Sequence, residues 1–144
     1  MSQEVVYNQS FKIKGGDFVN AGSVSVEIKR ILKEIGIRPE IVYRVSICCY
    51  EAEINIIMYA NSAILDFSVT PEEVIISIED KGPGIADIEK AMQDGYSTAT
   101  DEMREMGFGA GMGLPNIKKN SDEFKIESEV SKGTKLFIKT SLNW

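Results

Sequence analysis

The sequence predicts a two-layer α/β (α+β) sandwich, in which helices cover one face of a mixed, mainly antiparallel sheet. Three observations lead to this class. The first half contains two long stretches with apolar residues at helical spacing. Strand-like runs at 62–70 and 72–80 follow them and are joined by a turn at Pro71. Two further runs, 123–130 and 134–142, flank the turn sequence SKGT and predict a closing hairpin.

The chain begins with a predicted strand and a predicted helix. Residues 4–13 are rich in β-forming residues and partly alternate, which indicates a strand. We expect Asp17 to cap a helix that runs to Gly36, because aspartate favours helix starts and glycine favours helix ends. The expected apolar positions of this helix are Val19, Val24, Val26, Ile28, Ile31, Leu32 and Ile35.

A second helix is predicted from Pro39, which the first helical turn tolerates, to about Ala60. Its apolar stripe advances in steps of three and four residues through Ile41, Val45, Cys48, Ala52, Ile56 and Tyr59. Cys48 and Cys49 point about 100° apart on a helix, so they are poor partners for a disulfide or a shared metal. We expect both to be small core residues in a reducing cytosol.

The second half is predicted as strands around short helices. The run 72–80 is nearly continuous in Val and Ile, which indicates a central strand. A short helix is expected at 87–94, followed by a polar stretch, 95–106, without a clear period. Another helix is expected to follow the glycine run and to end near Asn120. Because there is no internal repeat or linker, residues 1–144 are predicted to form one domain.

Composition and charge exclude several classes of partner. The formal net charge is −6 and Lys and Arg are scattered, so no basic face is expected for nucleic acid. The first residues lack a signal-peptide pattern, and no apolar run reaches the roughly 20 residues that span a bilayer. We therefore expect a cytoplasmic protein without a membrane segment. Histidine is absent, which removes histidine triads, histidine metal sites and a histidine autokinase.

A glycine run, Gly107 to Gly113, has glycine at every second position before a predicted helix. Such loops commonly bind phosphate, since backbone N–H groups and the helix dipole converge on an anion. The spacing fits neither a dinucleotide fingerprint nor a P-loop, because Leu114 follows the last glycine. Taken alone, the run favours an ordinary flexible loop.

Two other patterns have polar groups suited to a nucleotide. Asp80, Gly82 and Gly84 end the predicted central strand, where a carboxylate can accept from an exocyclic amine such as that of adenine. Alone, they are typical of an ordinary turn.

Glu51 and Asn55 are four residues apart, hence on one face of the second helix. The amide oxygen suits a hard cation such as Mg²⁺ and the carboxylate suits a general base, whereas a surface pair is the alternative for any one helix.

Together, these patterns resemble the GHKL superfamily of ATPases, with its Bergerat ATP-binding fold, which includes gyrase, Hsp90, the histidine kinases and MutL. The resemblance rests on Glu-x-x-x-Asn, Asp-x-Gly-x-Gly, the glycine run and Gly133-Thr134, in that order. It extends from about residue 40 to the end. The sequences NIIMYA, MQDGYSTA and GMGLPNIKKNSDEF are most similar to the anti-sigma factor serine/threonine kinases, in the switch-kinase branch. Residues 99–106 look longer than that branch usually has, and Met58 stands where histidine kinases carry a basic residue.

The resemblance implies a role for each patterned residue. Glu51 would act as general base, and Asn55 would ligate Mg²⁺ on the ATP phosphates. Asp80 would bind the adenine amino group, with Gly82 and Gly84 letting the base approach the backbone. Thr134 would support Asp80 or the adenine through its hydroxyl.

For the part of the site that would bind the phosphates, the resemblance implies backbone contacts but does not assign a cation. The triphosphate would be wrapped by the main-chain N–H groups of Gly109, Gly111 and Gly113. Gly107 is interpreted as a hinge. Three neighbouring cations are candidates for a phosphate contact: Arg104, Lys118 and Lys119. The sequence does not choose between them.

The implied activity is that of an ATP-dependent protein serine/threonine kinase acting in a partner-switching pathway. Its substrate would be a STAS-domain anti-sigma antagonist or a related scaffold protein. The alternative is a non-catalytic module that responds to ATP or ADP and sequesters a sigma factor or another regulator. A base at Glu51 favours the kinase, because a pure binder does not need one. Proteins of this type often dimerise, and the sequence leaves a homodimer open.

Overall fold

The computed structural model describes residues 5–85, 87–93 and 113–142. Its strands form one sheet in the order β1-β2-β3-β5-β4, and every pairing in it is antiparallel. The strands are β1 (Tyr7–Lys14), β2 (Ser62–Val69), β3 (Glu73–Lys81), β4 (Glu123–Glu129) and β5 (Gly133–Ser141). The helices are the 3-10 turn η1 (Phe18–Asn20), α1 (Ser23–Ile35), α2 (Pro39–Tyr59), α3 (Ile88–Ala91) and α5 (Gly113–Lys119).

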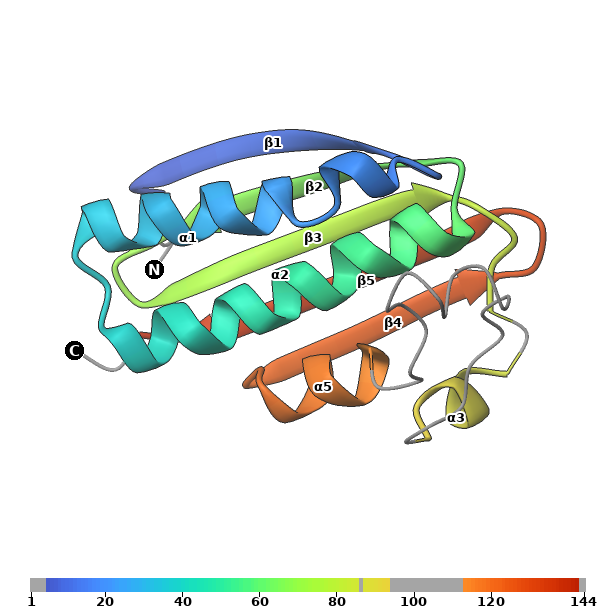
Figure 1. The fold of residues 1–144 in the computed structure, drawn as a ribbon. Helices are drawn as coiled ribbons and strands as arrows, with labels where there is room; N and C mark the ends of the chain where they lie inside the picture. The colour runs from blue at the N-terminus through green and yellow to red at the C-terminus, as the bar shows by residue number, and fades with distance from the viewer. Residues whose placement is uncertain (1–4, 86, 94–112, 143–144) are drawn as a thin grey trace.

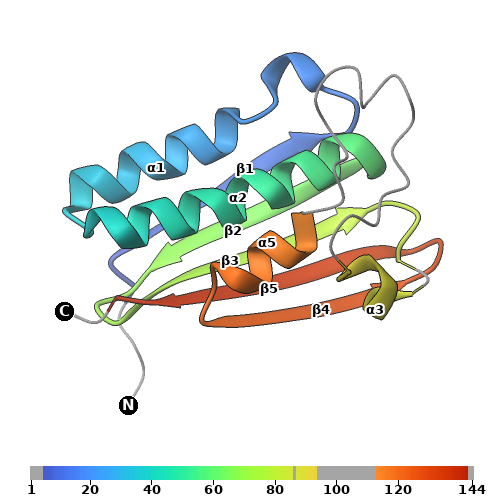
Figure 2. The ribbon, with the colours of Figure 1, turned by 60° about the horizontal axis from the view of Figure 1, so that its bottom comes forward.

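The helices α1, α2 and α5 cover one face of the sheet, as Figures 1 and 2 show. This confirms the predicted two-layer architecture. The sheet differs from the expected mixed one, since the described strands make antiparallel pairs throughout. β3 occupies the centre of the strand order, as its continuous Val and Ile content predicted.

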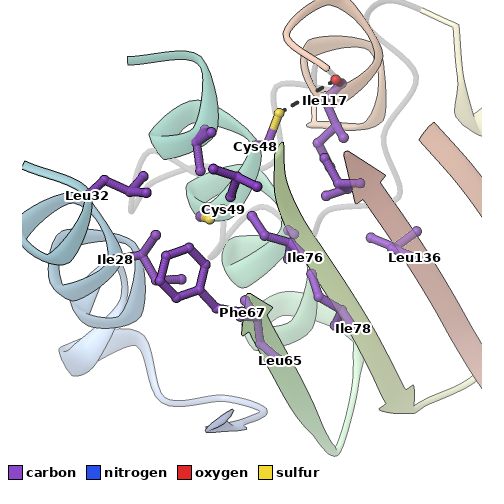
Figure 3. Packing of buried hydrophobic residues seen from close by; sticks show 14 of the residues in the cluster. Ile28, Leu32, Cys48, Cys49, Leu65, Phe67, Ile76, Ile78, Ile117 and Leu136 are labelled. Carbon is purple, nitrogen blue, oxygen red and sulfur yellow. Dashed lines mark hydrogen bonds between the residues drawn. The ribbon is translucent and has the colours of Figure 1, made fainter. Parts of the chain in front are cut away.

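The hydrophobic core lies between the sheet and the helices. Along β2 and β3, buried side chains alternate with more exposed ones, as expected for strands covered on one face only. Figure 3 shows the inward-facing residues of both layers meeting. The most buried among them, each at most 2% exposed, include Ile28, Leu32, Leu65, Phe67, Ile76, Ile78 and Ile117.

Helix α1 is shorter than predicted. It begins at Ser23, because Gly22 adopts a left-handed conformation with φ of 92° and separates it from η1. Val19 belongs to η1 and is 95% exposed, and Val26 is 67% exposed, so both were wrongly expected in the apolar stripe. Val26 faces away because it lies about 200° around the helix from the buried Ile28. Ile35, in the last turn, is also exposed.

A carboxylate from α2 binds the start of α1. Glu53 is 1% exposed and accepts hydrogen bonds from the backbone N–H groups of Gly22 and Val24, both at 3.2 Å, and of Ser25, at 3.0 Å. The first N–H groups of a helix have no partner within it, and burying them unpaired is costly. Glu53 therefore does the work of an N-cap residue from a neighbouring helix, 28 positions beyond Ser25.

Helix α2 agrees with its prediction. Pro39 lies in the first turn, and the stripe residues through Ile56 are at most 3% exposed, whereas Tyr59 is only partly buried. Cys48 and Cys49 are buried and carry free thiols. Burial raises the pKa of the Cys48 thiol to about 12, so it packs as a small apolar group. Its Sγ lies 3.7 Å from the carbonyl oxygen of Ile117, which brings α5 against α2 (Figure 3).

The remaining predicted elements are present with shifted ends. Helix α3 has one turn, and the side chain of Asp87 caps it by accepting from the Lys90 N–H at 3.0 Å. Strands β4 and β5 form the predicted hairpin. Within the ranges that the structure describes, no helix combines the length and the apolar character needed to cross a membrane.

Candidate functional site

The predicted site residues lie where the C-terminal half of α2, the end of β3, the start of α5 and the start of β5 come together. The ends of α2 and β3 adjoin, since the Asn61 N–H donates to the Lys81 carbonyl oxygen at 2.8 Å. A Cβ atom added to Gly82 would lie 3.0 Å from the Cα of Ala60. The fold therefore joins the Glu51–Asn55 helix to the Asp80 turn through direct backbone contact.

Asp80 is a half-buried carboxylate on the helical side of β3. The backbone N–H of Thr134, in the neighbouring strand β5, donates to its Oδ1 at 3.0 Å. Burial raises the pKa of Asp80, and the Thr134 N–H opposes that shift by stabilising the charged form. One carboxylate oxygen is thereby fixed, and among the described residues no donor binds the other, Oδ2.

Gly133 has a structural reason to precede Thr134. Its φ is 120°, a value that side chains disfavour, and a Cβ there would lie 2.2 Å from the carbonyl oxygen of Asp80. The absence of a side chain lets β5 approach the Asp80 backbone closely enough for the Thr134 N–H to reach Oδ1. The Gly-Thr pair thus shapes the carboxylate site through the main chain.

The Thr134 hydroxyl contacts Ser128 and not Asp80, and its expected contact with adenine stays a prediction. It is 2.8 Å from the hydroxyl of Ser128, so the contact with Asp80 comes from the Thr134 backbone and not from its side chain. Ser128 also accepts from the Ile85 N–H at 2.7 Å, which ties the turn after β3 to the closing hairpin. Sequence reasoning missed Ser128. The hairpin register places it directly opposite Thr134, and counting back from the turn would have found it.

Glu51 and Asn55 lie together against the first residue of α5. A Cβ on Gly113 would lie 3.1 Å from Asn55 Oδ1 and 3.4 Å from Glu51 Oε2. Such a Cβ would be in tight contact with the Asn55 amide and at ordinary van der Waals distance from Glu51. The start of α5 therefore lies close to this pair on α2.

Asn116 was not predicted as a site residue. Its Nδ2 donates to Glu51 Oε1 at 3.4 Å from one turn further along α5. Burial raises the pKa of Glu51, and this hydrogen bond partly opposes the shift. No local pattern indicated Asn116, because its contact with Glu51 depends on how α5 packs on α2.

The other predicted residues fall into two groups. Gly84 is described and has φ of 75°, with the Glu129 carbonyl oxygen 2.3 Å from where its Cβ would be, so hairpin packing already requires a glycine. Lys118 lines a hollow of about 420 Å³ between α3, α5 and β4, together with Met92 and Phe124. Those that lie outside the described residues are Arg104, Gly107, Gly109 and Gly111, with the segment 99–106.

The described residues fit ATP and Mg²⁺ by their chemistry. Asp80 presents a carboxylate oxygen to an amine, and Asn55 presents an amide oxygen beside the glycine that opens α5. Mg²⁺ commonly takes only one or two protein ligands when phosphates and water complete its shell. The assignments of these residues to the adenine, the metal and the phosphates remain predictions.

An antiparallel α+β sandwich with these groups at one end has the layout of a nucleotide-binding domain. The histidine kinase-like ATPase domain family matches residues 19–140, and the chain belongs to this family. The superfamily indicated by the four motifs is thereby confirmed. Membership of an ATPase domain family also supports ATP as the nucleotide.

Several named proteins are similar to this chain. The serine/threonine-protein kinase RsbT of Bacillus subtilis (strain 168) is 32% identical over 112 residues, which cover 75% of this chain and 78% of the relative. An anti-sigma F factor of Clostridium perfringens (strain SM101) is 25% identical over 130 residues, or 86% of this chain and 89% of the relative. Both similarities fall within the anti-sigma kinase branch that the sequence indicated.

A solved structure supports the fold. The crystal structure of the RsbU and RsbW domains of a Mycobacterium tuberculosis protein superposes with a TM-score of 0.61 at 15% identity. The alignment covers 93% of this chain and 32% of the larger one. The likeness confirms the α+β architecture of the family.

Proposed function

We propose that this chain is an ATP-dependent protein serine/threonine kinase of the anti-sigma regulatory type. The observation that carries the proposal is the placement of Glu51 and Asn55 against Gly113, which brings the proposed base and the proposed metal ligand to the end of the glycine run. The 32% identity to a serine/threonine-protein kinase over most of both chains supports it. A module that only binds nucleotide has no use for a half-buried carboxylate at this position.

Nucleotide recognition falls to Asp80 in this proposal. Its Oδ1 is held by the Thr134 N–H, which leaves Oδ2 to accept from the adenine amino group. When bound, ATP supplies the phosphoryl group and Mg²⁺ neutralises charge on its phosphates. Asn55 would contribute the protein ligand to that ion through Oδ1.

Glu51 is the proposed general base. Its carboxylate would take the proton of the partner's hydroxyl as that oxygen attacks the phosphoryl group. Half-burial makes the carboxylate a stronger base than an exposed one, because desolvation disfavours its charged form. Phosphoryl transfer depends mainly on positioning and electrostatics, so one carboxylate and one metal ligand suffice on a small domain.

The substrate we propose is a serine or threonine of a STAS-domain anti-sigma antagonist or a related scaffold protein. Similarity to proteins named anti-sigma F factor supports a regulatory setting, with a sigma factor as a further partner. The choice of a STAS domain rests on the resemblance of the motifs to the switch-kinase branch.

The test is transfer of labelled phosphate from ATP, with Mg²⁺, to purified STAS-domain proteins of the same organism. Glu51→Ala is expected to lower transfer by about 10²–10⁴-fold while leaving ATP affinity within about twofold. Glu40→Ala, an exposed glutamate in the first turn of the same helix, is the matched control and should transfer normally. Transfer at the wild-type rate by Glu51→Ala would remove the base assignment. Absence of label on every STAS protein would favour the non-catalytic, nucleotide-responsive module.

A further inference from the structure

The contact between Asn116 and Glu51 distinguishes the two oxygens of the proposed base. Oε1 faces α5 and accepts from Asn116 Nδ2 at 3.4 Å. Oε2 faces the start of α5, 3.4 Å from where a Cβ of Gly113 would lie and on the side of Asn55. Among the described residues, Asn116 is the one side chain that hydrogen-bonds the Glu51 carboxylate.

The backbone at Asn116 is anchored by its surroundings. Its neighbours Leu114, Pro115 and Ile117 are buried, so the face of α5 that includes them is anchored in the core. The Asn120 side chain donates to the Asn116 carbonyl oxygen at 2.9 Å. A side chain on such a rigid turn can fix the orientation of a carboxylate across the α2–α5 contact.

An amide suits this task better than a cation. Lysine or arginine would form a charge-assisted pair with the carboxylate, and arginine would engage both oxygens at once. A neutral donor binds one oxygen and leaves the lone pairs of the other free. Contacts of this kind are often long without substrate and shorten in the reacting complex, which is consistent with 3.4 Å here.

We propose that Asn116 is a positioning residue that holds Oε1 of Glu51 so that Oε2 receives the proton of the incoming hydroxyl. The proton moves from the hydroxyl to Oε2 as the new phosphorus–oxygen bond forms and the bond to the leaving ADP oxygen breaks. This inference rests on the proposed kinase activity, because it concerns the atom at which the base acts.

The experiment compares Asn116→Leu with the wild type in single-turnover phosphotransfer at saturating ATP, Mg²⁺ and STAS-domain acceptor. The transfer rate should fall about tenfold or more, because a misplaced reacting group costs rate strongly, while ATP affinity stays within about twofold. In a Glu51→Ala background, Asn116→Leu should cause no further loss, since its effect passes through that carboxylate. Asn8→Leu is the control, because this exposed amide on β1 bonds Asp66 and touches neither Glu51 nor Asn116.

An unchanged transfer rate in Asn116→Leu would overturn the inference, and so would two other outcomes of the transfer and affinity measurements. An equal loss of ATP affinity and transfer would make Asn116 a nucleotide-binding residue, and a further loss in the Glu51→Ala background would give it a purely structural role. A second measurement does not depend on activity: in NMR spectra, the Asn116 side-chain amide protons should shift when Glu51 becomes Ala, while those of Asn8, which bonds Asp66 on β2, stay in place. If the wild type labels no acceptor, the proposed function fails, and unshifted Asn116 protons would separately refute the contact.

Discussion

Asp80 combines two opposing influences on one carboxylate. Burial raises its pKa, whereas the Thr134 N–H at 3.0 Å stabilises the charged form. The net effect is a carboxyl group that takes up a proton at a higher pH than an ordinary aspartate does. Because an amine donor needs the ionised oxygen, this has a direct consequence for nucleotide binding.

We predict that ATP affinity falls as pH decreases through the raised pKa of Asp80. The ionised form, which accepts the adenine amine, predominates above that pKa and is lost below it. The apparent affinity should then decline about tenfold per pH unit, because only the ionised fraction competes for ligand. Calorimetric titrations of ATP across the acidic range would measure this.

The control for that prediction is Asp80→Asn. The variant should bind ATP roughly 10–100-fold more weakly at neutral pH, the range for losing a hydrogen bond to a charged group. It should also lack the part of the pH profile that depends on Asp80. The titration of ATP itself is common to both proteins and cancels in the comparison. Glu79→Gln changes an exposed neighbour on the other side of β3 and should leave both quantities unchanged. Unaltered affinity in Asp80→Asn would contradict the adenine assignment.

Helix α1 depends on a contact from another helix. Glu53 accepts three backbone N–H groups at its start, and the carboxylate is buried. Gly22, which precedes the helix, has no side chain that could serve as a local cap. The start of α1 is therefore fixed only when α2 packs beside it.

We predict that Glu53→Ala lowers the free energy of unfolding by about 2–4 kcal/mol, since it leaves buried N–H groups without an acceptor. Urea denaturation would measure the loss. Glu34→Ala, which removes an exposed carboxylate from α1 that pairs with Arg30, should change stability by less than about 1 kcal/mol. Equal losses of unfolding free energy in the two variants would show that the buried Glu53 contacts stabilise the fold no more than an exposed ion pair does.

The two helices α1 and α2 differ in how well local sequence signals predict them. Helix α2 followed from Pro39 and a regular apolar stripe, which are local signals. The prediction that α1 begins near Asp17 was wrong, because α1 begins at Ser23. The acceptor of its first N–H groups is Glu53, which lies on another helix and leaves no local signal. Short patterns predicted Glu51, Asn55 and Asp80 as site residues, and these roles stay predictions. Ser128 and Asn116 were not predicted, because their contacts arise from strand register and helix packing.

At the scale of the whole molecule, the proposed nucleotide site draws on four separate segments. The proposed contributors are Asp80 from β3, Thr134 from β5, Asn55 from α2 and Gly113 from α5. A ligand that contacts all four binds the folded state and not the unfolded chain. Binding should therefore raise global stability as well as local order.

We predict that ATP with Mg²⁺ raises the melting temperature. At an ATP concentration 100-fold above Kd, the stabilisation is about 2.7 kcal/mol, or roughly 10 °C for a domain of this size. Differential scanning fluorimetry would measure the shift, and Asp80→Asn should show most of it lost at the same ATP concentration. A full shift in that variant would mean that ATP binds without Asp80.

The contact between Thr134 and Asp80 spans 54 positions of the chain, and β5 inserts between β3 and β4. On the ribosome, Asp80 and the strand that carries it are synthesised well before Gly133 and Thr134. Until the β4–β5 hairpin leaves the exit tunnel, β3 has no neighbour on that side and the Asp80 carboxylate has no Thr134 N–H to fix it. The proposed nucleotide site therefore cannot assemble during synthesis before this hairpin has emerged.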